Sequence, residues 1–340
     1  MVPNTQSAPL TRSGTPAPTA EQAKPIAPAA AGAAIAPQSA EGQTIRSIEQ
    51  LRGTRRQTTE GGRLIIREPD RTIIREGDRT IIRHNELDRF RYGARDVRVN
   101  RRGTETTTIV VRPDGSRIVT VTDENGYLLR RARILPDGRE IVLIDNRPRG
   151  VSFRIGNFFV ELAPPRIRIP RERYIVEIER ASPVLIYETL IAPPVDVIAR
   201  AYTLDEIRYS STLRDRMPRI DLNTVTFDTG SWELTLDQIA KLAGIAEGIN
   251  RAIRRNPREV LLIEGHTDAV GDEHDNLSLS DRRAESVALA LTQEFGVPPE
   301  NLATQGYGEQ YLKVPTDGPE RANRRVTIRR ITPLLMGQAR

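Results

Sequence analysis

Residues 265–287 read GHTDAVGDEHDNLSLSDRRAESV, and they directly follow the apolar run Val260–Glu264. The apolar run predicts a buried strand. The glycine-containing stretch after it predicts a loop, and Ser278 with Asp281 forms a capping box that predicts a helix over about residues 279–295. The stretch therefore predicts a strand, a loop and a helix in succession.

An acidic residue and a basic residue lie at the two ends of this loop. Asp268 follows the strand, and Arg283 falls in the first turns of the predicted helix, so both side chains are expected to face the same loop mouth. A carboxylate binds an ammonium group, and a guanidinium binds a carboxylate through two parallel bonds. The pair predicts a site for a small zwitterion. Each residue also has a purely structural interpretation, since Asp268 can cap the loop and Arg283 can pair with Glu285 or Asp281 on the helix surface.

The remainder of residues 220–340 alternates between strand and helix patterns. Apolar residues recur at helical spacing over residues 235–255, which predicts a further helix. Further strands are predicted at residues 224–227, 302–305 and 326–331. The order predicts an α+β fold, a β/α/β/α/β-β sandwich in which helices cover one face of a mixed sheet.

The chain before residue 220 divides into three parts. Residues 1–45 are rich in Ala and Pro and predict a disordered tether. Residues 46–200 predict a β-hairpin or meander region, a charged stalk or interaction module, and residues 201–219 predict a linker helix opened by the capping box Thr203–Glu206.

Two patterns indicate strands in residues 46–200. The segments at 63–67, 71–75 and 79–83 repeat with a period of eight, which is even and returns equivalent side chains to one face. Short β segments joined by Asp-Gly and Asn-Gly turns follow over residues 106–145. Further strands are predicted at residues 151–155, 158–162 and 174–178.

Composition excludes several classes of protein. The net charge is +6, but Asp and Glu alternate with Arg and form no long single-sign run, which argues against nucleic-acid binding. No stretch approaches the ~20 apolar residues of a membrane helix, and the first residues do not resemble a signal peptide. Because the chain has no cysteine, it forms no disulfide and no thiolate metal site.

Several separated motifs occur in a fixed order along residues 220–332. They are Val225–Gly230, Glu264–Asp268, Gly271, Asn276–Leu279, Arg283-Ala284, Gly306–Glu309 and Asn323–Val326. In this order and spacing they resemble the OmpA-like C-terminal family of peptidoglycan-binding domains. The resemblance covers about a third of the chain and leaves the β-hairpin region unassigned.

The resemblance implies a ligand and a set of site residues. In that family the ligand is the diaminopimelate residue of the peptidoglycan stem peptide, and its amino and carboxylate groups are held by an Asp and an Arg that correspond here to Asp268 and Arg283. The other residues that it places at the site are Asn276 and Thr267 in the loop, Phe227 and Asp228 on the opposite lip, and the basic pair Arg324 and Arg325.

The resemblance also implies a location and a class of function. It implies a non-enzymatic anchor of the periplasm, associated with the outer membrane, whose partner is peptidoglycan and which needs no cofactor or metal. Whether the protein also has a protein partner in the periplasm or outer membrane stays open.

Two alternatives remain. The β-hairpin region could act as an interaction scaffold, with the C-terminal domain serving only as a fold. A metal-assisted amidase would need ligands such as Glu264, His266 and the acidic run 272–275, but no His-x3-His spacing occurs and the run is expected to be a solvated loop tip. Serine catalysis is disfavoured because no Gly-x-Ser-x-Gly motif occurs, and Ser278 and Ser280 are interpreted as helix caps.

Overall fold

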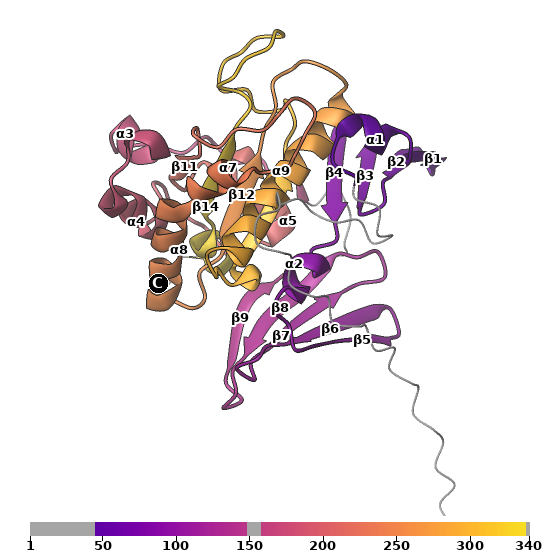
Figure 1. Cartoon of the computed structure of the whole chain (residues 1–340), viewed down its shortest axis with the longest axis vertical. Helices are drawn as coiled ribbons and strands as arrows, with labels where there is room; N and C mark the ends of the chain where they lie inside the picture. Colours follow the sequence, from indigo (N-terminus) through magenta and orange to yellow (C-terminus); the bar gives the residue numbers. More distant parts are fainter. Residues whose placement is uncertain (1–44, 148–157, 338–340) are drawn as a thin grey trace, which may run out of the picture.

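The computed structural model describes residues 45–147 and 158–337 (Figure 1). The expected tether, apart from its last residue, and the expected strand at 151–155 lie outside the described residues.

The C-terminal part is built on a five-stranded mixed sheet. Its order is β10 (Ile175–Glu177), β11 (Arg219–Asp221), β14 (Val326–Arg330), β12 (Leu261–Gly265) and β13 (Leu302–Gly306). β12 runs parallel to β13 and antiparallel to β14, and β10 runs parallel to β11. The α+β class with a mixed sheet is confirmed, and β10 extends the sheet to residues before the expected start at 220.

Helices lie against this sheet. One face is covered by α4 (Pro183–Ile191), α7 (Leu236–Ala240), α8 (Ala243–Arg255) and α9 (Glu273–Gln293). The other face is covered by α5 (Leu204–Tyr209), α6 (Ser211–Arg214) and α10 (Thr332–Met336). Successive residues of β12 point to opposite faces, so Leu261 packs in the first layer and Leu262 in the second. The expectation of helices on one face therefore describes only half of the packing.

Several predicted elements differ in the structure. Residues 224–227 and 158–162 form no strand, and the predicted helix at 235–255 is interrupted between α7 and α8. The linker helix keeps its capping box at Thr203 but breaks at Ser210, whose side chain caps α6.

The start of α9 is the largest difference. The helix begins at Glu273 because the Asp272 side chain accepts hydrogen bonds from the N–H groups of His274 and Asp275. Ser278 and Ser280 therefore lie inside the helix, and their interpretation as caps was wrong.

The residues before 148 form two antiparallel meanders. The first contains β1 (Arg56–Glu60), β2 (Arg63–Arg67), β3 (Arg71–Glu76) and β4 (Arg79–His84). The second contains β5 (Asp96–Arg102), β6 (Glu105–Val111), β7 (Arg117–Thr122), β8 (Leu128–Ile134) and β9 (Glu140–Asp145). The eight-residue repeat and the Asp-Gly and Asn-Gly hairpins are confirmed. The helices α1 (Ile48–Arg52) and α2 (Leu87–Arg91) precede the first and second meander, and α3 (Arg171–Tyr174) precedes β10.

The first meander is packed on the C-terminal part and does not project as a free stalk (Figure 1). Ile66, Ile73 and Ile82 form one hydrophobic cluster with Leu277 of α9. Every residue from Asp275 to Thr292 of α9 is buried. Packing against α9 removes the apolar side chains on one face of this meander from water. Because burial of apolar surface is favourable, the packed arrangement is more stable than an extended ribbon.

Candidate functional site

Asp268 and Arg283 lie on the two elements predicted for them. Asp268 follows the end of β12, and Arg283 lies in the middle of α9 rather than in its first turns. The helix and the strand approach closely at Gly265, where an added Cβ atom would lie 1.9 Å from the carbonyl oxygen of Ser280. Glycine at this position lets α9 bring its residues beside the loop that carries Asp268.

The Asp268 carboxylate is held by groups from a distant loop. Its Oδ2 atom accepts a hydrogen bond from Arg324 Nη1 at 2.5 Å and one from the Glu320 N–H at 3.3 Å. Oδ1 accepts no hydrogen bond from any residue that the structure describes. Because its partners lie more than 50 positions away, Asp268 does not serve merely as a local loop cap. One carboxylate oxygen is left for a ligand.

Arg283 is held by backbone carbonyls. Its Nε donates to Ser231 O at 2.9 Å and its Nη2 to Asp228 O at 3.1 Å, and the guanidinium lies 5.0 Å from the centre of the Phe227 ring. Nη1 has no hydrogen-bond partner among the described residues. The expected alternative, a surface pair with Asp281 or Glu285, was wrong, because those carboxylates bind side chains of the first meander and α2.

The charge of Arg283 is poorly compensated. Burial and the nearby Arg324 lower the pKa of Arg283 to about 10, and Asp268 opposes this effect. A buried guanidinium with a free N–H group and no carboxylate partner favours binding of an anion.

A cavity of about 250 Å³ opens beside these groups. Its lining contains four arginines, from α9 and from the loop before β14, next to two residues of the segment 224–227. The lining residues are Thr226, Phe227, Arg283, Arg321, Arg324 and Arg325.

The other expected site residues contribute in different ways. Asn276 donates from its side-chain amide to the carbonyl oxygens of Asp268 and Val270 and to Glu309, so it shapes the loop. The Thr267 backbone N–H donates to Gly308 O, and its hydroxyl is buried without a described partner. Asp228 offers its carbonyl group, while its side chain is exposed.

The basic pair lies in the coil before β14 and not within a strand. Arg325 is buried and donates to Asn323 O and Tyr311 O, whereas the Arg324 side chain is 42% exposed. Both line the cavity.

Sequence reasoning missed three contributors. Arg321 lines the cavity, Glu320 donates its N–H group to Asp268, and Ser231 accepts from Arg283. Two of them act through backbone groups, for which the side-chain sequence carries no signal. Arg321 lies in an irregular loop whose path the hydrophobic pattern does not predict.

The residues considered for a metal site are used for internal pairs. Glu264 binds Arg214 and Arg329, and burial together with neighbouring arginines lowers the pKa of His266. Asp275 is buried and pairs with Arg52 and Arg55, so the interpretation of residues 272–275 as a solvated tip is wrong for Asp275, whereas Asp272 is exposed. Within residues 45–147 and 158–337, no group of three potential ligands is placed to hold a metal ion.

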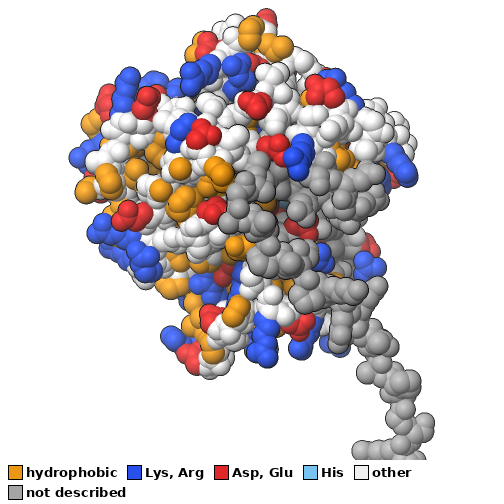
Figure 2. All heavy atoms as spheres, viewed as in Figure 1, with side chains coloured by type: hydrophobic (Ala, Val, Ile, Leu, Met, Phe, Trp, Pro, Cys, Tyr) orange, Lys and Arg blue, Asp and Glu red, His pale blue; other side chains and the backbone are white. Residues whose placement is uncertain are grey.

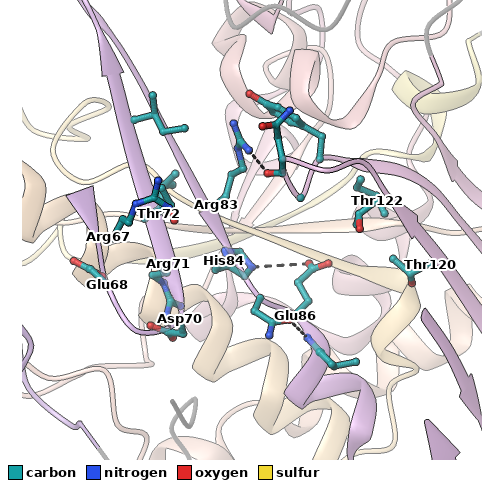
Figure 3. A pocket seen from close by; sticks show the side chains of 18 of the residues that line it. Arg67, Glu68, Asp70, Arg71, Thr72, Arg83, His84, Glu86, Thr120 and Thr122 are labelled. Atoms are coloured by element: carbon teal, nitrogen blue, oxygen red, sulfur yellow. Dashed lines mark hydrogen bonds and ion pairs between the residues drawn. The ribbon is translucent and has the colours of Figure 1, made fainter. Parts of the chain in front are cut away.

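A larger cavity, of about 970 Å³, separates the two meanders (Figure 3). Its charged side chains largely satisfy each other. Glu86 pairs with Arg131 and Arg89 and lies 3.9 Å from His84, and Asp70 pairs with Arg71. Thr72, Thr120 and Thr122 add hydroxyl groups from facing strands. We interpret this polar cavity as part of the interface between the two meanders.

The outer surface has no large area of one charge on the face shown in Figure 2. Lys and Arg side chains lie next to Asp and Glu side chains over that face. In the part of the chain that the structure describes, no helix combines the length and apolar character needed to cross a bilayer.

Comparison with known proteins locates the domain. Residues 226–325 match the model of the OmpA family. This segment is an OmpA-family domain. The match includes all six residues that line the smaller cavity.

Curated relatives share this segment. Outer-membrane lipoprotein YfiB of Pseudomonas aeruginosa is 44% identical over 84 residues, which cover 24% of this chain and 48% of that protein. Probable lipoprotein YiaD of Escherichia coli is 36% identical over 86 residues, which cover 25% of this chain and 37% of that protein. The chain thus spans less than half of the length of these relatives.

Solved structures align over a similar share of the chain. The peptidoglycan-associated lipoprotein from Burkholderia pseudomallei is 27% identical, with a TM-score of 0.27, over 31% of this chain and 86% of that one. The periplasmic domain of Helicobacter pylori MotB is 23% identical, with a TM-score of 0.28, over 36% of this chain and 73% of that one.

Proposed function

We propose that this protein binds peptidoglycan non-covalently and without catalysis, through the diaminopimelate residue of a stem peptide. Asp268 Oδ1 would accept the ligand's ammonium group, and Arg283 Nη1 would donate to its carboxylate. The observation that carries the proposal is that Arg283 lines the small cavity, that Asp268 is bonded to Arg324 of the same lining, and that each of the two groups keeps an atom that no described residue satisfies.

The surroundings of both groups favour recognition rather than reaction. Both side chains are almost fully buried, and their remaining atoms are fixed by Arg324, Ser231 and Asp228. Groups held in place before binding lose little further freedom when the ligand arrives. The proposed contacts are charge-assisted hydrogen bonds, each contributing about 1.5–3 kcal/mol.

The relatives support a cellular location for this activity. YfiB is an outer-membrane lipoprotein and YiaD a probable lipoprotein, and one of the solved structures is of a peptidoglycan-associated lipoprotein. We therefore propose that the chain acts in the periplasm, associated with the outer membrane, and anchors the envelope to the wall. Many stem peptides on one polymer would raise the apparent affinity of copies held together.

Cosedimentation of the full chain with purified diaminopimelate-type peptidoglycan tests this function. Loss of one charge-assisted contact should weaken binding by about ten- to a hundredfold, so Asp268→Ala and Arg283→Ala should both remain in the supernatant. Asp137→Ala and Arg254→Ala are matched controls on exposed positions of the β8–β9 turn and α8, and should bind as the unaltered chain does.

A melting curve of each variant separates loss of the contact from loss of the fold. If folded Asp268→Ala and Arg283→Ala still cosediment fully, the assignment of the clamp is wrong. If the unaltered chain stays in the supernatant, the peptidoglycan function itself is wrong, and the β meanders become the part of the molecule to examine.

A further inference from the structure

The small cavity carries more positive charge than a zwitterion needs. Four guanidinium groups line it, and its lining contains no acidic side chain. Asp268 does not line the cavity but is bonded to the lining residue Arg324. A zwitterion brings one ammonium and one carboxylate and leaves this surplus unchanged.

Arg321 and Arg325 have no carboxylate within ion-pair distance among the described residues. Arg325 is buried, and its two hydrogen bonds go to the neutral carbonyl groups of Asn323 and Tyr311. Arg321 is exposed and makes no described side-chain hydrogen bond. Both therefore keep N–H groups with which an anion can form charge-assisted bonds.

The cationic groups also destabilise each other. Burial lowers the pKa of Arg283 to about 10, and the neighbouring lining residue Arg324 lowers it further; burial also lowers the pKa of Arg325 to about 10, with a contribution from Arg219 outside the lining. A ligand that adds negative charge in this cavity relieves that repulsion, whereas a ligand of zero net charge does not.

We infer that the cavity recognises a second carboxylate of the same stem peptide, held by Arg321 and Arg325 beside the clamp formed by Asp268 and Arg283. This inference rests on the proposed function and adds a specificity to it. The favoured ligand presents two carboxylates and one ammonium group to the site. Stem peptides in which that second carboxyl group is amidated bind less well.

The second carboxylate has two sources in a stem tripeptide that ends in diaminopimelate. One is the α-carboxylate of the glutamate residue that precedes diaminopimelate, and the other is the carboxylate at the peptide C-terminus. Amidation of either removes one negative charge and changes the size of the ligand very little. Two mono-amides therefore distinguish the sources.

Isothermal titration of the full chain with the synthetic tripeptide tests the inference. The peptide is used as the free acid and as each of the two mono-amides. We expect one mono-amide to bind about tenfold more weakly than the free acid, which corresponds to the loss of one charge-assisted bond. Equal affinity of all three peptides, within twofold, would overturn the inference.

Variants then locate the receptor of the second carboxylate. Arg321→Gln and Arg325→Gln are titrated with all three peptides, and Arg254→Gln, an exposed position on α8, is the control for removal of one positive charge. Loss of the discrimination in either variant, with the control unchanged, supports the inference. Discrimination that persists in both variants contradicts it.

The two proposals fail in different ways. If the unaltered chain does not bind the free-acid tripeptide, or Asp268→Ala binds it equally well, the proposed function fails. If binding depends on Asp268 but ignores amidation, the function stands and only the second-carboxylate site is rejected.

Discussion

Replacement of Asp281 by asparagine tests whether buried charges join the first meander to the OmpA-family domain. Asp281 lies in α9 and is completely buried. Its Oδ2 accepts from Arg71 Nε at 2.8 Å and lies 2.9 Å from His84 Nδ1, while Oδ1 accepts from the Gly306 N–H at 2.8 Å. Asp281→Asn has nearly the same shape and can keep the Gly306 bond, but it removes the negative charge.

The expected loss follows from the partners that remain. Breaking a buried ion pair by removing one partner costs about 3–5 kcal/mol, because the other charge is left uncompensated. Here Asp70 still pairs with Arg71, and Glu285 lies 3.6 Å from His84 Nε2. We therefore expect the lower end, about 3 kcal/mol of the free energy of unfolding.

Urea unfolding at pH 7 measures this free energy. Asp137→Asn, in an exposed turn, is the control. The double variant Asp281→Asn with Arg71→Met removes the stranded cation and should be less destabilised than the sum of the two single variants. A loss below about 1 kcal/mol, or strict additivity in the double variant, would refute the claim that this pair joins the two parts.

Two further predictions concern pH and packing. Burial disfavours the charged form of His84, but Asp281 and Glu285 outweigh this effect and raise the pKa of His84. The contribution of His84 to stability is therefore complete below its unfolded pKa of about 6.5 and is lost as pH rises through its folded pKa. Melting curves from pH 6 to 9 should show this loss of stability, and His84→Gln should abolish the pH dependence. Gly265→Ala places a methyl group 1.9 Å from Ser280 O and should lower the free energy of unfolding, measured by chemical denaturation, by at least about 1–3 kcal/mol. In the control Gly244→Ala the nearest neighbour of the added methyl group lies at 3.9 Å, so this variant should be neutral or stabilising. Equal effects of the two variants would contradict the close approach of β12 and α9.

The elements that were predicted correctly depend on local pattern. The repeat of Arg-Thr-Ile-Ile-Arg segments predicts β3 and β4 because an even period returns side chains to one face, and the Gly126 turn has the positive φ of 79° that Asn-Gly hairpins require. Helical periodicity likewise predicts most of α8. Such signals are contained in a few neighbouring residues.

The errors depend on contacts that are distant in sequence. Ser278 and Asp281 match the capping-box pattern, but they do not cap the helix. Ser278 donates to Glu68, and Asp281 binds Arg71 and His84. These partners lie about 200 positions away, and no periodicity reports them. The same contacts explain why a charged meander that was expected to form a stalk is packed against α9.

The candidate clamp shows the same division between local and distant information. The sequence predicts that Asp268 and Arg283 border one loop, but it does not predict that Arg324 already occupies one oxygen of Asp268. This ion pair places a third charge beside Arg283, which lowers the pKa of Arg283. A ligand ammonium approaching the remaining oxygen of Asp268 is also repelled by Arg324, so binding of an ammonium group alone is weakened. A ligand that brings its carboxylate to Arg283 at the same time offsets that repulsion, and the arrangement therefore favours ligands in which both groups are joined over either group alone.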